Sequence, residues 1–325
     1  MIPIRDTIQS KNYPVMTMAI IAVNVAAWFM EPSQGWDMNR FMVLYGLVPA
    51  RYTVDAVAEH FTLLQQMFSF LSFMFLHAGI FHLLGNMWFL YIFGDNVEDR
   101  LGPVRFLIFY LLCGWASGLT HFAFNMESQI PIVGASGAIA GVMGAYFVLY
   151  PRARVLTLIP LLFIPYFVEI PAAFFLGIWF LIQFLSASLE GSLGGGGIAW
   201  WAHVGGFLFG VLFYYLVRMI PTTGVLERLQ EATVRRRTPR LQVLRTSRET
   251  GGHDVYGTIM ITPEEAREGA RKIVNIPAGF RKRLFRVMVP SGVSTGTMLK
   301  LAGLGEKKDA GARGDAYLRV IVEGE

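Results

Sequence analysis

The chain has 325 residues, of which 54% are hydrophobic, 14% aromatic and 16% charged. An average soluble domain carries roughly 25% charged residues, so this composition excludes an ordinary soluble protein and indicates a membrane protein. The formal net charge is +5, but most of the 28 lysines and arginines follow Arg218, so no nucleic-acid partner is expected. The single cysteine, Cys113, excludes an internal disulfide.

Six apolar runs occupy the first two thirds of the chain, each near the roughly 17–25 residues that a helix needs to cross the hydrocarbon core. The first run is expected to be a spanning helix rather than a cleavable leader, because no clear cleavage site follows it. With a cytoplasmic N-terminus, most basic residues between the runs fall on the cytoplasmic side. We therefore expect an all-α polytopic domain of six transmembrane helices over residues 1–218, in the cell (inner or plasma) membrane, with both termini cytoplasmic. The runs lie at about 15–30, 78–96, 104–124, 134–150, 167–188 and 198–217.

The long segment 31–77 separates the first two runs, and its end, FTLLQQMFSFLSFMFL, is itself apolar. A seventh crossing here would place several arginines on the outer side, against the positive-inside bias. We therefore expect residues 31–77 to be a partly interfacial loop.

The composition changes after the last run. Residues 219–257 are basic and poor in aromatic residues, which is typical of a solvated linker near anionic lipid headgroups. Residues 258–325 alternate apolar and polar positions between Gly and Pro turns, as strands do. A small all-β cytosolic domain is expected there, and its small core makes pairing with a second copy or a partner plausible.

Four polar residues interrupt the runs at one expected depth. His82 and Asn86 are four residues apart and share one helix face. Ser136 and His203 lie early in the fourth and sixth runs, and the second, fourth and sixth helices of a six-span domain run in the same direction. Polar groups inside a membrane are costly, so such a coincidence indicates a functional site.

Glycines accompany two of these residues. Gly137 and Gly141 follow Ser136, and Gly206 and Gly210 follow His203, each pair in the G-x-x-x-G spacing that lets helices approach closely. A Ser–His hydrogen bond of about 2.6–3.2 Å requires such an approach. The spacing therefore favours a nucleophile and a base on two tightly packed helices.

Other functions stay open on the residues alone. A lone serine in a transmembrane helix usually bonds to its own backbone. One alternative is a transporter or proton relay that uses His82, Asn86 and His203, and a second is a non-proteolytic scaffold for membrane proteins. The first would depend on the histidines but not on Ser136, and the second on neither.

Three motifs resemble those of the rhomboid intramembrane serine proteases, and the resemblance covers roughly residues 14–218. They are Gly134-Ala135-Ser136-Gly137, similar to the family's G-x-S-G, Ala202-His203-Val204-Gly205-Gly206, similar to its A-H-x-x-G, and FLHAGIFHLLGNMWFLYIFGDNVEDRLG at 75–102, similar to its second-span signature with His77, His82 and Asn86.

The resemblance implies a serine endopeptidase that cleaves transmembrane or juxtamembrane segments of proteins in the lipid bilayer, with no metal or cofactor. Ser136 would be the nucleophile and His203 the general base of a catalytic dyad. The backbone N–H of Ser136 and the side chains of His82 and Asn86 would hold the oxyanion. Gly134 would leave room for the substrate carbonyl.

The sequence departs from the family in how the histidine is held. Position 140 is alanine, where the family often has an aromatic residue against which the catalytic histidine packs. No Asp or Glu lies early in the second, fourth or sixth run, so a third, orienting carboxylate is not expected. The Trp-Arg pair that some members carry in the first loop is also missing.

Two further features bear on access to the site. The run at 167–188, with Pro171 and Gly177, is the expected lateral gate on family grounds, and its Glu169 is expected to be a boundary charge. The four glycines at 194–197 precede two tryptophans, which suits either a mobile cap or a plain loop with an interfacial aromatic belt.

The C-terminal residues 258–325 resemble the peptide-binding β-sandwich of DnaJ-type co-chaperones. The similar stretches are ITPEEAREGARKIVNIPAG, VPSGVSTGTMLKLAGLGEK and RGDAYLRVIVE, and no His-Pro-Asp of a J domain is present. The resemblance implies a module that binds cytosolic peptide segments or pairs two copies of the chain.

Overall fold

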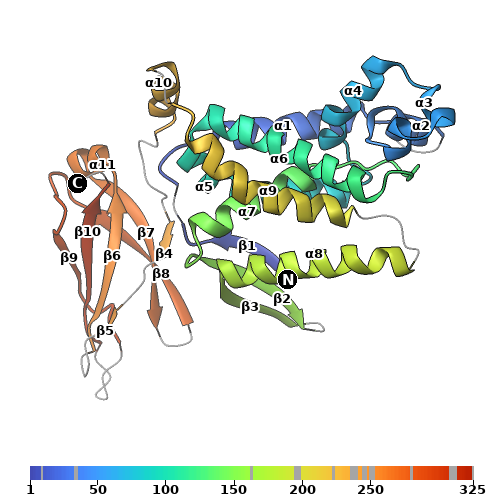
Figure 1. Ribbon diagram of the computed structural model, residues 1–325. Helices are drawn as coiled ribbons and strands as arrows, with labels where there is room; N and C mark the ends of the chain where they lie inside the picture. The colour runs from blue at the N-terminus through green and yellow to red at the C-terminus, as the bar shows by residue number, and fades with distance from the viewer. Residues whose placement is uncertain are drawn as a thin grey trace. The chain divides into compact units, whose positions relative to one another are not determined.

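The computed structural model divides the chain into two compact units, Met1–Val234 and Arg235–Glu325 (Figure 1). Each unit is described by itself. The structure describes residues 1–8, 10–32, 36–161, 164–193, 199–221, 224–234, 241–243, 247–248, 253–278, 281–306 and 313–323.

The first unit is mainly helical. Its six apolar helices are α1 (Val15–Met30), α5 (Ile80–Leu101), α6 (Pro103–Phe124), α7 (Ser136–Leu149), α8 (Ala172–Leu193) and α9 (Trp200–Arg218). The break between α5 and α6 is sharp because Gly102 has a φ of 79° and Pro103 supplies the first residue of α6. A short helix, α10 (Gly224–Ala232), follows α9.

In the described part of the chain, fewer helices meet the length and hydropathy requirements of a membrane span than the six predicted, so the predicted count is not confirmed. Within the described residues, α6, α8 and α9 are long and apolar enough to span a membrane, and a fourth crossing results if α4 (Leu63–Ser72), with its 3-10 turn, and α5 count as one span bent by 75°. The other two, α1 and α7, are apolar but only 16 and 14 residues long. Hydropathy alone could not show this, because helix ends depend on local turns such as the one at Gly134.

The segment 31–77 is more ordered than the predicted loop. It holds α2 (Trp36–Tyr45), η1 (Pro49–Tyr52), α3 (Asp55–Ala58), α4 and η2 (Phe73–Phe75). Arg51 is fully buried and donates hydrogen bonds to the carbonyls of Val43, Leu44 and Gly46. A capping box formed by Thr62 and Gln65 begins α4. The distribution of basic residues indicates only which side of the membrane a loop lies on, so it could not predict short helices within the segment 31–77.

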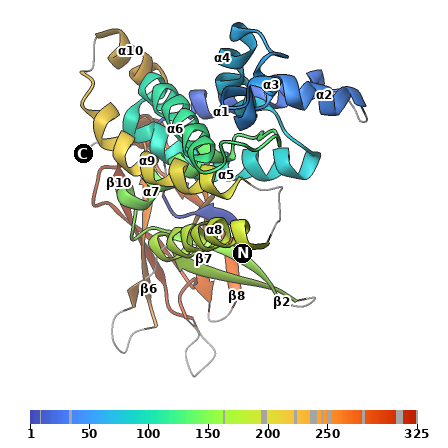
Figure 2. The same cartoon turned by 45° about the vertical axis from the view of Figure 1, so that its right-hand side comes forward.

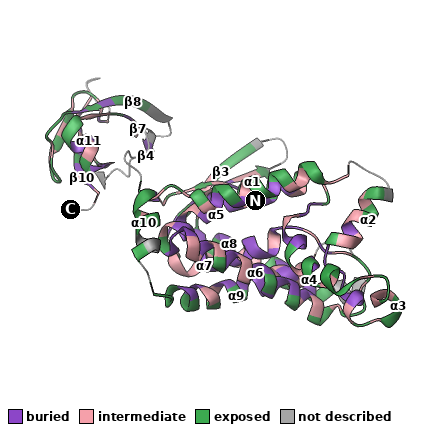
Figure 3. Ribbon diagram, turned by 90° about the horizontal axis from the view of Figure 1, so that it is seen from above, coloured by how far each residue is buried: buried purple, intermediate pink, exposed green. Residues whose placement is uncertain are grey.

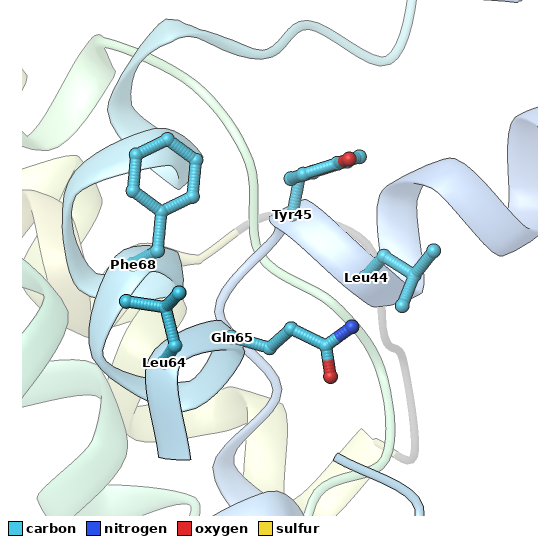
Figure 4. Close-up of a pocket in the computed structure, with 5 residues that line it drawn as sticks. All are labelled: Leu44, Tyr45, Leu64, Gln65 and Phe68. Atoms are coloured by element: carbon cyan, nitrogen blue, oxygen red, sulfur yellow. The ribbon is translucent and has the colours of Figure 1, made fainter. Parts of the chain in front are cut away.

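A pocket of about 280 Å³ lies between α2 and α4 (Figure 4). Its lining residues are Leu44, Tyr45, Leu64, Gln65 and Phe68. Leu64 is 77% exposed, so the pocket belongs to an open apolar surface of the segment 31–77. None of the predicted site residues lines it.

A three-stranded antiparallel sheet replaces the start of the predicted fifth span. Its order is β1 (Ile2–Asp6), β2 (Arg154–Leu161), β3 (Ile164–Pro171), all labelled in Figure 1. Helix α8 begins only at Ala172 and lies beside β2 (Figure 2). Prolines at 160, 165 and 171 explain the change, since proline lacks an N–H and is unfavourable inside a helix. Glu169 pairs with Leu156 in this hairpin, and Pro171 ends β3 rather than lying in the helix.

Asp6 of β1 connects the sheet to the C-terminal end of α7 by a hydrogen bond. Its carboxylate Oδ2 accepts hydrogen bonds from the Tyr146 hydroxyl at 2.5 Å and from Asn96 Nδ2 at 2.9 Å. Burial raises the pKa of Asp6 to about 7, and the hydrogen bond from Tyr146 opposes part of that rise.

The core of the first unit surrounds α7. Every residue from Gly137 to Tyr146 is buried, so this helix is enclosed on all sides by its neighbours (Figure 3). Six of those ten residues are glycine or alanine, which leaves little side-chain volume between α7 and its neighbours. Ser136 is therefore positioned by the most enclosed helix of the unit.

The second unit contains two small sheets. One has the order β5 (Ser247–Arg248), β6 (Val255–Ile261), β10 (Ala316–Val322), β9 (Met298–Leu301), and the other β4 (Leu241–Val243), β7 (Ala270–Ala278), β8 (Arg281–Val289). A short helix, α11 (Pro263–Glu268), follows β6. Fully buried residues such as Ile259, Val274 and Leu318 form its core. The stretch predicted as a linker, 219–257, holds α10, β4, β5 and the start of β6, and its residues 222–223, 235–240, 244–246 and 249–252 lie outside the described ones.

Candidate active site

Ser136 is the first residue of α7, and the backbone before it is unusual. Gly134 has a φ of 129°, which a residue with a side chain rarely adopts. Its N–H donates to the carbonyl of Phe73 at 2.8 Å, which holds the turn against η2. The turn places the half-buried Ser136 at the start of a helix whose next ten residues are buried.

The closest contacts between α9 and α7 are made by backbone atoms of glycine residues. A Cβ added to Gly206 would lie 2.0 Å from the carbonyl oxygen of Gly137, and one added to Gly210 would lie 2.1 Å from that of Gly141. A Cβ added to Gly144 of α7 would likewise lie 2.2 Å from the carbonyl oxygen of Phe207 in α9. These contacts leave no room for a side chain, so they bring the two helices as close as helices can pack.

The close packing brings Ser136 and His203 together. The Oγ of Ser136 and the Nε2 of His203 are 2.7 Å apart, which is a hydrogen-bond distance. Both side chains are half-buried. A serine hydroxyl that donates to an imidazole nitrogen has the arrangement of a nucleophile with its general base.

The other ring nitrogen of His203 contacts a residue that the sequence analysis did not select. Gln183 of α8 has its Oε1 2.8 Å from Nδ1 of His203, and its side chain is buried. Because Oε1 accepts, Nδ1 carries the proton and Nε2 is left free to accept from Ser136. The sequence carries one signal for this residue, a lone amide inside the apolar run 167–188, but the shared direction of the second, fourth and sixth helices does not point to the fifth.

Aromatic rings beside His203 come from helices other than α7. The ring of Trp179 in α8 lies 6.0 Å from the imidazole, and that of Trp200 in α9 lies 6.3 Å from it, edge to face. Ala140 is fully buried. A Cβ added to Gly206 would lie 3.3 Å from the Cβ of Ala140, so position 140 faces α9 closely. An aromatic side chain at position 140 would therefore collide with α9, and α8 supplies the ring instead.

His82 and Asn86 lie next to Gly134. A Cβ added to Gly134 would be 2.9 Å from His82 Nε2 and 3.6 Å from Asn86 Nδ2. Within the described residues, the buried Nδ2 of Asn86 has no hydrogen-bond partner. An unpartnered buried donor beside a glycine leaves a place for an acceptor atom from another molecule.

His77 lies behind this pair. Its ring is 5.1 Å from that of His82, and its backbone N–H donates to the carboxylate of Glu31 at 3.0 Å. The side chain of His77 is fully buried. It therefore packs beside His82, one of the predicted oxyanion residues.

The predicted access features are only partly described. The four glycines at 194–197 lie outside the described residues. Gly177 lies in α8, where a Cβ would meet nothing within 4 Å. Of the three helices that could each span a membrane, α6, α8 and α9, α8 is the least buried, which leaves most of its surface for contact with lipid.

Comparison with known proteins gives one family. Residues 64–220 match the Rhomboid domain. The chain is 31% identical over 158 residues to RHOMBOID-like protein 6, mitochondrial, of Arabidopsis thaliana, which covers 46% of this chain and 44% of that protein. It is 27% identical over 235 residues to Rhomboid protein 1, mitochondrial, of Saccharomyces cerevisiae, covering 68% and 59%.

A third relative is the Rhomboid protease GluP of Bacillus subtilis, 33% identical over 133 residues, or 41% of this chain and 24% of GluP. The chain thus spans between about a quarter and three fifths of the length of these three relatives. The match over residues 64–220 and these relatives support membership of the rhomboid family, and together with the apolar helices they indicate a membrane protein.

Proposed function

We propose that this chain is an intramembrane serine endopeptidase in which Ser136 attacks the peptide bond and His203 acts as general base. The observation that carries the proposal is the 2.7 Å contact between Ser136 Oγ and His203 Nε2 inside a membrane domain. The rhomboid match over residues 64–220 and the relative named a rhomboid protease support the same reaction class.

The reaction follows the general course of acyl transfer. His203 Nε2 takes the proton from Ser136 as Oγ bonds to the substrate carbonyl carbon, and the same proton then goes to the leaving amine as the C–N bond breaks. A water molecule, activated by His203, hydrolyses the resulting acyl-serine. The contact of Gln183 Oε1 with His203 Nδ1 supports the role of His203 as general base, because it leaves Nε2 free to accept the proton of Ser136.

The developing oxyanion would be held by the backbone N–H of Ser136 and the side chains of His82 and Asn86. The position of Asn86 Nδ2 near Gly134, without a partner in the described part of the chain, supports this role. Replacing Asn86 by Leu is expected to lower kcat on the order of 10²-fold, because loss of one oxyanion donor removes stabilisation that is made only in the transition state. The variant should still place Ser136 beside His203, since the hydrogen bond between those two residues does not involve Asn86.

The substrates would be transmembrane or juxtamembrane segments of other membrane proteins. A helical carbonyl is shielded by its own hydrogen bond, so the scissile segment must unwind before Ser136 can reach it. Segments with Gly, Pro or other small residues near the membrane surface are therefore the expected substrates.

The test uses wild type, Ser136→Ala and His203→Ala reconstituted with a fluorescent transmembrane reporter. Both variants should lose cleavage, and Ser136→Ala should also lose labelling by a fluorophosphonate. Cleavage that persists in Ser136→Ala would overturn the assignment. Transport that needs His82 and His203 but not Ser136 would favour the transporter, and native function in both variants would favour the scaffold.

The membrane and the orientation are part of the proposal. We propose a cell (inner or plasma) membrane with both termini cytoplasmic, although two of the relatives are named as mitochondrial. Fractionation of the source cells tests the first point. Protease accessibility of the second unit in sealed inside-out vesicles tests the second.

The second unit is proposed to bind extended cytosolic peptide segments. Its strand β8 is the last strand of the sheet β4-β7-β8 and exposes Leu284 and Met288, at 63% and 62%. An exposed edge strand with apolar side chains can accept another strand. Replacing both residues by Ser in the full chain should weaken capture of such segments and leave reporter cleavage intact, whereas a change in oligomeric state would instead indicate pairing of two copies.

A further inference from the structure

The amide of Gln183 is placed where a Ser-His-Asp triad has its carboxylate. It lies on α8, it is buried, and its Oε1 is 2.8 Å from His203 Nδ1, on the side of the ring opposite Ser136. Resting on the proposed protease function, we infer that Gln183 is the positioning residue of His203 and that it makes the dyad competent only while α8 is docked on α9.

The first step is the chemistry of the acceptor. An imidazole flips between two tautomers, and only the one with its proton on Nδ1 leaves Nε2 able to take the serine proton. Gln183 Oε1 favours that tautomer. A neutral amide does so at a smaller desolvation cost than a carboxylate inside a membrane domain, where ionised side chains are expensive.

The second step is how α8 is attached. Trp179, Phe180 and Gln183 lie within one turn of each other and face α9, where the Phe180 and Phe207 rings are 4.8 Å apart. These are side-chain contacts of the least buried of the three long helices. A displacement of α8 would separate Gln183 from His203 while the α7–α9 contact, which is made by glycine backbone, keeps Ser136 in place.

The experiment compares Gln183→Leu, Gln183→Glu and Phe180→Leu in the full chain with the transmembrane reporter, over a range of pH. The other titratable side chains near His203 are His82 of α5 and His121 of α6, and none of the variants touches them. Gln183→Leu removes the acceptor, so kcat should fall about 10- to 100-fold with KM unchanged, less than the about 10⁴-fold loss for a triad carboxylate. The acidic limb of its pH–rate profile should move to lower pH, because the imidazolium loses its partner.

Gln183→Glu keeps the shape and adds charge, so its acidic limb should move to higher pH. Phe180→Leu is the packing control, and it should lower kcat with no shift of the limb. Opposite shifts in the two Gln183 variants support the inference. Wild-type activity in Gln183→Leu, or an unshifted limb in both Gln183 variants, overturns it. If Gln183→Leu does not fold, the direction of the shift in Gln183→Glu decides alone.

The outcome is separable from that of the proposed function. If Ser136 of the wild type is not labelled by a fluorophosphonate and the reporter is not cleaved, the protease proposal fails. If the wild type is labelled and cleaves, but the Gln183 variants behave like Phe180→Leu, only the positioning role fails.

Discussion

Two contacts of α9 differ in kind. On α7 the closest contacts near the site are made by backbone, with carbonyl oxygens of Gly137 and Gly141 directly against Gly206 and Gly210, and the rings of Phe147 and Phe207 meet farther along the helices. On α8 the contact is made by large rings, with Phe180 and Trp179 against Phe207.

The difference separates two tasks. Backbone against backbone has no rotamers to change, so the separation of α7 and α9, the helices that carry Ser136 and His203, is set rigidly. Aromatic side chains can repack, so the partner of the second imidazole nitrogen comes from a surface that tolerates movement. A single histidine is thus held on one side by a rigid contact and on the other by an adjustable one.

The largest expected effect comes from breaking the backbone contact. In Gly206→Val the new Cβ would lie 2.0 Å from the Gly137 carbonyl, so α9 must move away and His203 with it. Fluorophosphonate labelling and reporter cleavage should both be lost. Gly177→Ala on α8, where a Cβ meets nothing within 4 Å, is the matched control and should keep full activity. A fully active Gly206→Val would show that the contact is not rigid.

A smaller effect is expected from adding the aromatic residue that α7 lacks. Ala140→Phe overpacks a fully buried position that faces Gly206, at a cost of about 1–3 kcal/mol in the free energy of unfolding. Thermal unfolding in detergent should show the loss, together with reduced cleavage. Higher activity than wild type would mean that His203 prefers a ring from α7 after all.

At the contact between α8 and α9, Trp179→Leu should have a smaller effect on cleavage than the two substitutions above. It removes a ring 6.0 Å from His203 but leaves the Gln183 and Ser136 contacts, so kcat should fall less than in Gln183→Leu. Phe174→Leu, on an α8 residue that is 61% exposed, controls for the loss of an aromatic ring. Equal effects of the two substitutions would show that Trp179 has no special place beside the histidine.

The smallest effect concerns the far end of α7, where Asp6 accepts from Tyr146. Burial raises the folded pKa of Asp6 to about 7 from 3.8, so the unfolded chain releases this proton first and stability falls as the pH rises from about 4 through 7. Between pH 6 and 8 the free energy of unfolding should drop by about 1 kcal/mol from this group. Asp6→Asn should flatten that part of the profile, measured by chemical or thermal unfolding in detergent. An unchanged slope would rule out Asp6 as its source.

The predicted site residues and the partner of His203 illustrate what pattern reasoning reaches. Ser136, His203 and the glycines could be selected because short motifs and i, i+4 spacing are local properties, and the structure brings Ser136 and His203 within hydrogen-bond distance. The role of Gln183 was missed because it depends on how α8 is rotated and where it lies against α9. Spacing within a helix predicts which residues share a face, but it does not predict which other helix packs against that face.

The boundaries of the elements show the same division. Six helices in the described part of the first unit overlap the apolar runs, but the fifth run began too early, because 167–171 pairs with β2 in a hairpin. Helices in the segment 31–77 were also missed. Both errors arose where hydropathy was high, since an apolar strand, a surface helix and a membrane span have similar composition over ten residues.

By itself the sequence determined that this is a membrane protein, that its polar residues gather in three motifs, and that a second, β-rich region follows. These conclusions rest on composition and short spacings, which are independent of the fold. The tertiary structure decided which atoms meet: the glycine contacts of α7 and α9, the partner of His203 on α8, and the rings that replace an aromatic residue at Ala140. The physical reason is that hydrogen bonds and close packing depend on distances of a few tenths of an ångström between segments far apart in the chain.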